Sequence, residues 1–251
     1  YAKDSIENEV APSKHALFYT AHLLCLAGLS GILLTGDAFN LFVFLEVSSL
    51  ATYTLVSLAS DRRCLVAAFR YLMMGTIGAT FILIGVGMLY MKTGTLNMLD
   101  LASRIDLYDS SRTINSGLAF IMVGVSIKLA LFPLHMWLPP AYTHAPSAVS
   151  AFLAGTATKV AVYVMIRFIF TVFGVNHVFE EMGMDLILMA LAIVAIFKCS
   201  YMATVQSNVK TVLAYSSVAQ IGYMILGLSL VSVAGLMSGL IHIFNHAAID
   251  G

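Results

Sequence analysis

The sequence predicts an all-α polytopic membrane protein, a bundle of about eight transmembrane helices. The chain has 251 residues, of which 60% are hydrophobic and only 10% are charged. A soluble domain carries about 25% charged residues, and the mean hydropathy of +0.91 points the same way. Because lipid offers no partner to backbone polar groups, spanning segments must satisfy them internally, and helices do so.

Seven complete apolar stretches and an incomplete eighth are long enough to cross a bilayer. About 20 residues, at about 1.5 Å per residue, cover about 30 Å of hydrocarbon. The stretches lie at 16–35, 38–59, 65–91, 116–138, 147–173, 185–204 and 210–231, and the eighth begins near 233. Asp37 and Ser207 are predicted helix N-caps. Only the connection 92–115 is long and polar.

The basic residues of the connections indicate the orientation. One side is predicted to hold Lys3, Lys14, Arg62, Arg63 and Lys210, whereas the other holds Lys92, Arg104 and Arg112 within the long connection. Cytoplasmic loops carry an excess of Lys and Arg. The connections 61–63 and 205–210 are therefore predicted to be cytoplasmic.

Composition and motifs exclude several classes of function. The net charge is zero, which argues against nucleic acid as a partner. The three cysteines are widely spaced and form no C-x-x-C pair, so neither a zinc nor an iron–sulfur site is predicted. No G-x-G-x-x-G follows a strand pattern, so no dinucleotide site is predicted. We therefore expect no cofactor in this chain.

Three charged residues stand inside the apolar stretches: Glu46, Lys128 and Lys159. A charge at mid-span costs about 2.5–3.5 kcal/mol on insertion scales, so each needs a compensating role. The alternative for Lys128 is snorkelling to the interface, and for Glu46 it is an ion pair that only holds helices together. Because burying either charge alone is costly, the charged atoms of Glu46 and Lys128 are predicted to lie about 3–7 Å apart. Arg167 and Lys198 lie nearer helix ends, where snorkelling is predicted.

Pro133 is predicted to break the helix over 116–138. It has no N–H to donate, and its ring displaces the carbonyl four residues earlier. A broken helix at membrane depth is tolerated where it lines a hydrated cavity; a simple packing kink is the alternative. The prolines within 139–146 predict no regular helix before about Ser147, and His135 is predicted to be interfacial.

The last stretch carries His242, His246 and Asp250 at spacings of i, i+4 and i+8. Such residues line one helix face at intervals of about 6 Å, which water can bridge. Two histidines and an acid on one face of a membrane helix favour a proton relay. A metal site is the alternative, although no further ligand cluster accompanies the three residues.

Four segments together resemble one family of membrane proteins. They are "TGDAFNLFVFLEV" (35–47), "IKLALFPLHMWLPPAYTHAPSAVSAFLAGTATKVAVYVMIR" (127–167), "NVKTVLAYSSVAQIGYM" (208–224) and "HIFNHA" (242–247). They resemble the antiporter-like subunits of respiratory complex I, of membrane-bound hydrogenases and of multisubunit sodium/proton antiporters. The spellings "GDAFNLFVF" and "WLPPAY" look most similar to the antiporter D subunit.

The resemblance implies a division of the chain. The family fold has about fourteen helices and contains two five-helix units related by inverted topology, each with a broken helix. By this resemblance, 16–173 is a first unit and 185–251 an incomplete second unit of a single membrane domain, 1–251. The chain begins at Tyr1 without Met and stops at Gly251 within an apolar segment, so we expect an internal piece of a longer protein.

The resemblance also assigns roles by position. Glu46 matches the essential glutamate of the family, Lys128 its lysine partner, and Lys159 the next lysine toward the centre. His242 and His246 match the relay histidines.

Two departures from the family pattern accompany these matches. Asp250 stands where the family has a lysine, so the relay is expected to end in an acid rather than in a lysine. The next broken helix of the family, with its exit-side group, is absent from this sequence.

The resemblance implies proton translocation by an antiporter-like subunit of a larger complex. The expected partners are other membrane subunits, the lipid bilayer, and protons or Na⁺ as cargo, in a bacterial inner membrane. The alternative is a subunit of an NADH:quinone oxidoreductase or membrane-bound hydrogenase that couples redox chemistry to pumping. A seven-helix receptor is a third class, against which the mid-span charges and the broken helix argue. No redox centre is predicted within the chain itself.

Overall fold

The computed structural model describes residues 3–105, 107 and 111–250, without the side chain of Asp250. Its regular structure is helical, apart from two isolated β-bridges. In chain order the elements are α1 (Lys3–Glu9), η1 (Pro12–Lys14), α2 (His15–Leu34), α3 (Ala38–Ser57), α4 (Arg63–Thr93), α5 (Met98–Ile105), α6 (Arg112–Lys128), α7 (Leu138–His144), α8 (Ser147–Gly155), α9 (Ala157–Arg167), η3 (Phe168–Phe173), η4 (Asn176–Glu181), α10 (Met184–Thr204), α11 (Val209–Ser229) and α12 (Val233–Asp250).

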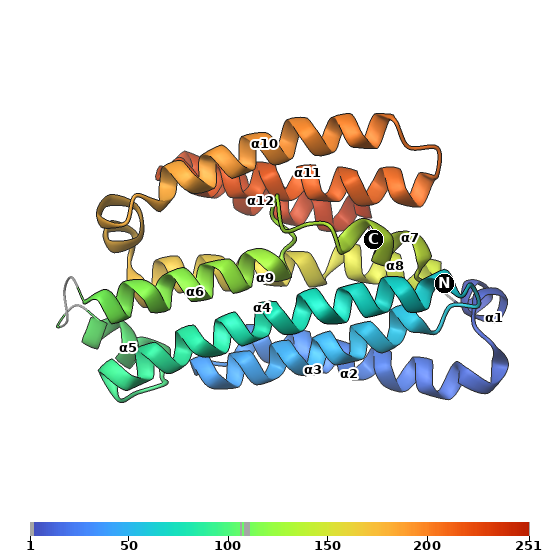
Figure 1. Ribbon diagram of the computed structural model, residues 1–251, viewed down its shortest axis with the longest axis horizontal. Helices are drawn as coiled ribbons and strands as arrows, with labels where there is room; N and C mark the ends of the chain where they lie inside the picture. The colour runs from blue at the N-terminus through green and yellow to red at the C-terminus, as the bar shows by residue number, and fades with distance from the viewer. Residues whose placement is uncertain (1–2, 106, 108–110, 251) are drawn as a thin grey trace.

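The long helices run side by side along the long axis of the molecule (Figure 1). Helices α2, α3 and α4 pack in succession, α4 packs against α6, and α10, α11 and α12 form a second group. The connections α3–α4 and α10–α11 lie at the same end as α1 and α7 (Figure 1). The connections 61–63 and 205–210, which were predicted to share one side of the membrane, thus lie at the same end of the bundle (Figure 1). Their cytoplasmic location stays a prediction.

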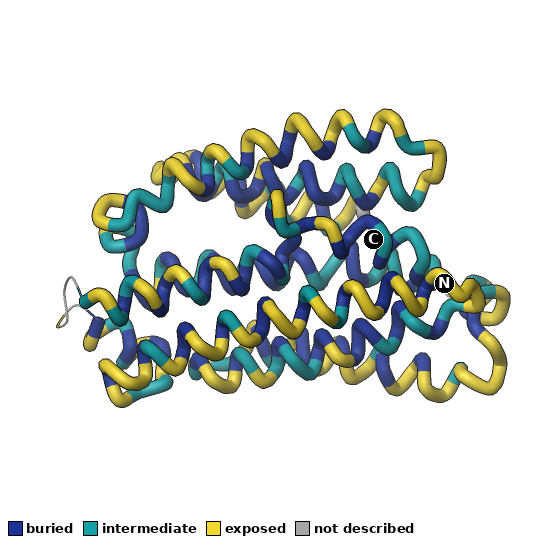
Figure 2. The backbone as a smooth tube through the Cα atoms, viewed as in Figure 1, coloured by how far each residue is buried: buried dark blue, intermediate teal, exposed yellow. Residues whose placement is uncertain are grey.

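The surface of the bundle is apolar along the outward faces of the helices. Figure 2 shows buried backbone along the inner faces and exposed backbone along the outer ones. Within the described residues, six helical segments are long and apolar enough to cross a membrane: 12–34, 38–57, 63–93, 147–173, 184–204 and 209–229. Exposed side chains such as Leu34, Phe197 and Phe244 lie on the outside of the bundle, as expected for contact with lipid.

Two predicted stretches, and the prediction of no regular helix before Ser147, differ from the helices that form. The stretch 116–138 is wrong at both ends, because α6 begins at Arg112 and ends at Lys128. The stretch 147–173 is interrupted at Thr156, whose φ and ψ of −123° and −59° separate α8 from α9, and it ends in the π-helical η3. A regular helix, α7, also forms before Ser147, because its two prolines occupy the first turn, where a missing N–H costs nothing.

One of the two predicted N-caps is confirmed. Asp37 accepts a hydrogen bond from the backbone N–H of Asn40 at 2.8 Å. The prediction that Ser207 is an N-cap is wrong. The N-cap of α11 is Asn208, whose side chain accepts from the N–H of Lys210 at 2.9 Å. Asn and Ser cap helices about equally well, so residue type alone did not separate these neighbours.

Glycines let α4 and α6 approach closely, and this contact places the end of α6. A methyl group on Gly124 would lie 2.5 Å from the carbonyl oxygen of Gly78, and one on Gly85 would lie 2.6 Å from that of Gly117. Small residues at such positions allow membrane helices to pack backbone to backbone. The last turn of α6, which ends at Lys128, is held against α4 in this way.

Gly124→Leu is therefore expected to destabilise the full-length protein by about 1–3 kcal/mol, the range for overpacking a close contact. The measurement is the thermal unfolding midpoint in detergent. Gly87→Leu is the matched control, because a Cβ there would meet nothing within 4 Å. Equal midpoints for the two variants would show that the α4–α6 contact tolerates a side chain.

Candidate functional site

The predicted contact between Glu46 and Lys128 is confirmed. The Nζ of Lys128 lies 3.2 Å from Oε1 of Glu46 and donates to the hydroxyl of Ser49 at 2.7 Å. The side chain of Lys128 is 7% exposed and that of Glu46 is 23% exposed. Lys128 therefore does not snorkel to the interface: its charge is held between helices α3 and α6 by a carboxylate and a hydroxyl.

An irregular segment, residues 129–137, follows Lys128 and contains Pro133. Ala130 has a φ of +60°, and the peptide bond before Pro133 is cis. The indole Nε1–H of Trp137 donates to the carbonyl oxygen of Ile127 at 2.9 Å. The same carbonyl accepts from the backbone N–H of Ala130 at 3.2 Å, so a side chain and a turn together satisfy it where the regular helix ends.

His135 and Lys198 also belong to the surroundings of this segment. His135 is only 5% exposed, so it is buried within the protein, and its location at the membrane interface stays a prediction. The ammonium of Lys198, on α10, lies 4.9 Å from the centroid of the Phe132 ring, within the range of a cation–π contact. The predicted snorkelling of Lys198 did not anticipate this aromatic partner.

A small cavity lies between Lys128 and α9. Its volume is about 30 Å³, and its polar lining includes Ser48, Ser49, Thr52 and Lys128. Ala157, Val160 and Ala161 of α9 line it as well, on either side of Lys159 in the sequence. A polar cavity above about 10–15 Å³ can hold a water molecule, so there is room for one between the Lys128 ammonium and α9.

Lys159 lies just after the break between α8 and α9. Its side chain is buried, with 6% of the residue exposed, and its ammonium donates to the carbonyl oxygen of Ala154 in the last turn of α8. The break at Thr156 is what exposes that carbonyl. Sequence reasoning missed this interruption, although Gly155 beside it is the residue type that commonly ends a helix.

Both buried lysines are associated with helix C-termini. Lys128 is the last residue of α6, and Lys159 contacts the last turn of α8. A helix C-terminus carries a partial negative charge that stabilises cations. Two helix ends inside the bundle thus offset part of the cost of burying two ammonium groups.

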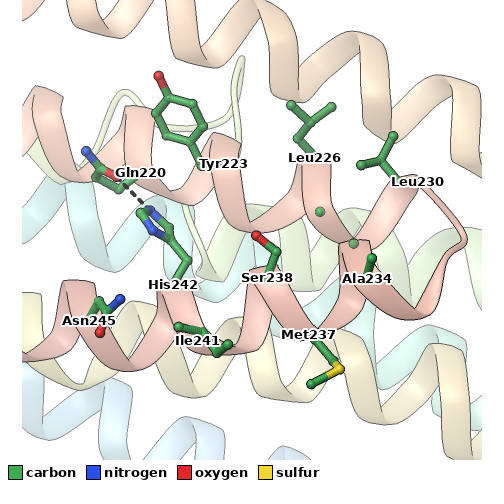
Figure 3. Close-up of a pocket in the computed structure, with 12 residues that line it drawn as sticks. Gln220, Tyr223, Leu226, Leu230, Ala234, Met237, Ser238, Ile241, His242 and Asn245 are labelled. Carbon is green, nitrogen blue, oxygen red and sulfur yellow. Dashed lines mark hydrogen bonds between the residues drawn. The ribbon is translucent and has the colours of Figure 1, made fainter.

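His242 and His246 face one another along α12, as predicted. Their ring centroids are 6.2 Å apart, and His246 is 4% exposed. The Nε2–H of His242 donates to Oε1 of Gln220 on α11 at 2.7 Å (Figure 3). His242 also lies within electrostatic range of the Lys159 charge. The side chain of Asp250 is outside the described residues.

The pocket in Figure 3 has a volume of about 670 Å³ and places His242 in an open space between α11 and α12. Gln220, Ser238 and Asn245 supply further polar groups. Among the described residues, no group of three His, Cys, Asp or Glu side chains lies close enough to hold a metal ion. The polar groups of this pocket are all hydrogen-bond donors or acceptors.

A third cavity, of about 260 Å³, lies at the end of the bundle that carries α7 (Figure 1). Its polar lining consists of Tyr142, Ser147, Ser150, Lys210 and Ser217, and its inner wall includes Ala154. Ala154 is the residue whose carbonyl receives the Lys159 ammonium. The cavity therefore extends from Lys210, next to the α10–α11 connection, to the immediate neighbourhood of Lys159. Sequence reasoning did not predict it.

A helical membrane bundle with two interrupted helices and with the buried side chains of Lys128, Lys159 and His246 is typical of proteins of the antiporter-like type. The family described as "NADH:quinone oxidoreductase/Mrp antiporter, TM" matches residues 35–251, and the chain belongs to this family. The family resemblance of the sequence is thereby confirmed.

Individual relatives come from both branches of the family. The N subunit of the NADH-quinone oxidoreductase of Desulforudis audaxviator is 44% identical over 244 residues, which are 96% of this chain and 47% of the relative. The D subunit of the Na(+)/H(+) antiporter of Alkalihalophilus pseudofirmus is 32% identical over 232 residues, 92% of this chain and 46% of the relative. Of these two relatives, the oxidoreductase protein has the higher identity over the whole matched length. The short segments "GDAFNLFVF" and "WLPPAY" had instead suggested the antiporter protein.

A solved structure matches over the same region. The membrane-bound sulfane sulfur reductase, an archaeal respiratory membrane complex, contains a chain with a TM-score of 0.84 and 34% identity, matched over 92% of this chain and 46% of that one. This chain spans about half the length of the curated relatives it matches. The comparisons therefore establish an integral membrane protein of the antiporter-like family.

Proposed function

We propose that this chain forms part of a proton-translocating subunit, in which Glu46, Lys128, Lys159, His242 and His246 pass protons along the membrane midplane. The observation that carries the proposal is the 3.2 Å contact between the Glu46 carboxylate and the Lys128 ammonium, buried between two helices at the end of a broken one. A charge pair that only joined helices would need neither a neighbouring cavity nor a second buried lysine.

The proposed order of transfer follows the contacts. The carboxylate of Glu46 stabilises the positive charge of Lys128 by Coulomb attraction. When that contact lengthens, Lys128 loses the stabilisation and releases its proton through a water in the small cavity toward α9, where Lys159 stands. Lys159 is followed by His242, which is within range of its charge, and by His246, one helical turn further on.

Besides the transfer from Lys128, the 260 Å³ cavity would give protons a second route to Lys159, from the end of the bundle that carries α7. Its hydroxyl groups and the Lys210 ammonium can order water, and its inner end is the turn of α8 that binds Lys159. The backbone break at Thr156 gives that water access to polar groups at membrane depth.

We further propose that the chain comprises a first five-helix unit, 16–173, and part of a second, 185–251. The match to about half of each relative supports a longer protein, whose other membrane subunits are the expected partners. We place it in a bacterial plasma membrane, with protons, and alternatively Na⁺, as cargo.

Lys128→Met tests the proposal directly. It keeps much of the side-chain volume but removes the titrating group, so proton transport by the full-length complex in membrane vesicles should fall by on the order of 100-fold. Lys92→Met, at the exposed end of α4, is the matched control. Transport near the wild-type rate in a fully assembled Lys128→Met complex would show that the lysine is not a transfer group.

The second candidate is a redox-driven complex, favoured by the 44% identity to an NADH-quinone oxidoreductase protein. Both candidates use the same buried groups, so they differ in the driving force and not in the site. Genes for hydrophilic iron–sulfur proteins beside this one would favour the redox complex. Genes for small membrane proteins alone would favour the antiporter.

A further inference from the structure

Glu9, in the N-terminal surface helix α1, reaches the beginning of α8 across 138 residues of sequence. Its carboxylate accepts from the backbone N–H of Ser147 at 2.5 Å and from the Ser147 hydroxyl at 2.6 Å. The backbone carbonyl of Glu9 accepts from the N–H and hydroxyl of Ser60 at 3.1 and 2.9 Å. One residue thus joins the α3–α4 connection to the start of α8.

Helix α8 has no cap of its own. Its N-cap position is Pro146, which offers no side-chain acceptor, whereas N-caps are normally Ser, Thr, Asp or Asn. Glu9 supplies from another helix what Pro146 lacks: an acceptor for the first N–H and a negative charge at the positive end of the helix.

The position of α8 matters because both of its ends belong to the Lys159 site. Ser147, Ser150 and Ala154 all line the 260 Å³ cavity, and the carbonyl of Ala154, in the last turn, accepts from the Lys159 ammonium. With nine residues between Pro146 and Thr156, α8 is too short to be stable without tertiary contacts. Its first turn is held by Glu9, and its last turn by Lys159.

We propose that Glu9 is a positioning residue for Lys159: it caps α8 from α1 and so fixes the turn that presents the Ala154 carbonyl to the ammonium. The inference rests on the proposed transfer role of Lys159. In this proposal, helix α1, which precedes α2, sets the geometry of a group inside the bundle.

The test uses the full-length protein in its assembled complex, with hydrogen–deuterium exchange in α8 and proton transport per complex as two readouts. Glu9→Ala should speed amide exchange in the first turn of α8 by about five-fold, the loss of one cap, and should lower transport. Glu9→Gln keeps the length and one acceptor oxygen, so it should lie between Glu9→Ala and wild type. Glu7→Ala is the control, since Glu7 is exposed on the same helix and pairs only with Lys3, at 3.8 Å, among the described contacts.

A reciprocal variant separates capping from simple packing of α1. Ser147→Asp alone places a second carboxylate beside Glu9, so repulsion should speed exchange and lower transport. In Glu9→Ala/Ser147→Asp, a carboxylate within the first turn of α8 replaces the missing one, and both readouts should recover toward wild type. Additive losses in the double variant would overturn the proposal.

Failure of this inference differs from failure of the proposed function. Wild-type exchange and wild-type transport in Glu9→Ala would overturn the positioning role alone. Faster exchange in α8 without any change of transport would also overturn it, because the cap would then not act on the Lys159 site. Normal transport by a Lys159→Ala complex would overturn the proposed function itself.

Discussion

Glu46→Gln in the full-length protein should stop proton transport and leave the complex assembled. The amide keeps the shape and one acceptor oxygen for Lys128 but carries no charge, so the Coulomb interaction that switches during transfer is lost. We expect a decrease on the order of 100-fold in proton transport per assembled complex. The measurements are dye quenching in vesicles and the amount of complex on native gels.

A purely structural ion pair predicts a different outcome for the same variant. Removing one partner of a buried pair leaves the other charge uncompensated, at a cost of about 3–5 kcal/mol. Glu46→Gln would then lower the amount of complex and its unfolding midpoint, while transport per assembled complex stayed near normal. Glu180→Gln, at an exposed position of η4, controls for loss of a carboxylate elsewhere.

Lys159→Ala should abolish pumping in a complex that still assembles. Alanine removes the side chain that donates to the Ala154 carbonyl and that carries the proposed proton-transfer group between Lys128 and His242. Lys159→Arg should also impair transport, because a guanidinium does not release its proton in a protein. The loss in Lys159→Arg separates proton transfer from the mere presence of a positive charge.

The matched control for Lys159 is Lys92→Ala, at the exposed end of α4. It removes an ammonium of the same chain without touching the buried groups, and transport should remain at the wild-type level. Normal pumping by an assembled Lys159→Ala complex would eliminate Lys159 from the path and leave the Glu46–Lys128 pair without an onward acceptor.

The sequence was sufficient to predict those features of the site that depend on the type and spacing of individual residues. A carboxylate and an ammonium in apolar stretches had to be paired, because the cost of burying either alone exceeds that of joining them. The i, i+4 spacing of His242 and His246 fixed their separation near the observed 6.2 Å. The helical bundle followed from hydropathy and length alone.

The features that were missed depend on backbone geometry or on distant segments. Helix α6 ends at Lys128 rather than continuing toward Pro133. No proline lies at the interruption between α8 and α9 at Thr156, so no residue type predicted it. The contact of Glu9 with Ser147 joins segments 138 residues apart. Such contacts arise from packing, and no local pattern of residue types specifies them.

Removing both charges of the central pair at once separates proton transfer from structural support. Glu46→Gln/Lys128→Met leaves no uncompensated charge, and replacing a buried ion pair by uncharged residues is often neutral for stability. The full-length complex is placed in liposomes under an imposed potential of about 100 mV, which is worth about 2.3 kcal/mol per elementary charge, and proton flux and the unfolding midpoint are measured. The proposed relay predicts a midpoint close to that of the wild type and no proton flux. Wild-type flux through the doubly neutral complex would contradict it, because protons would then cross without the pair.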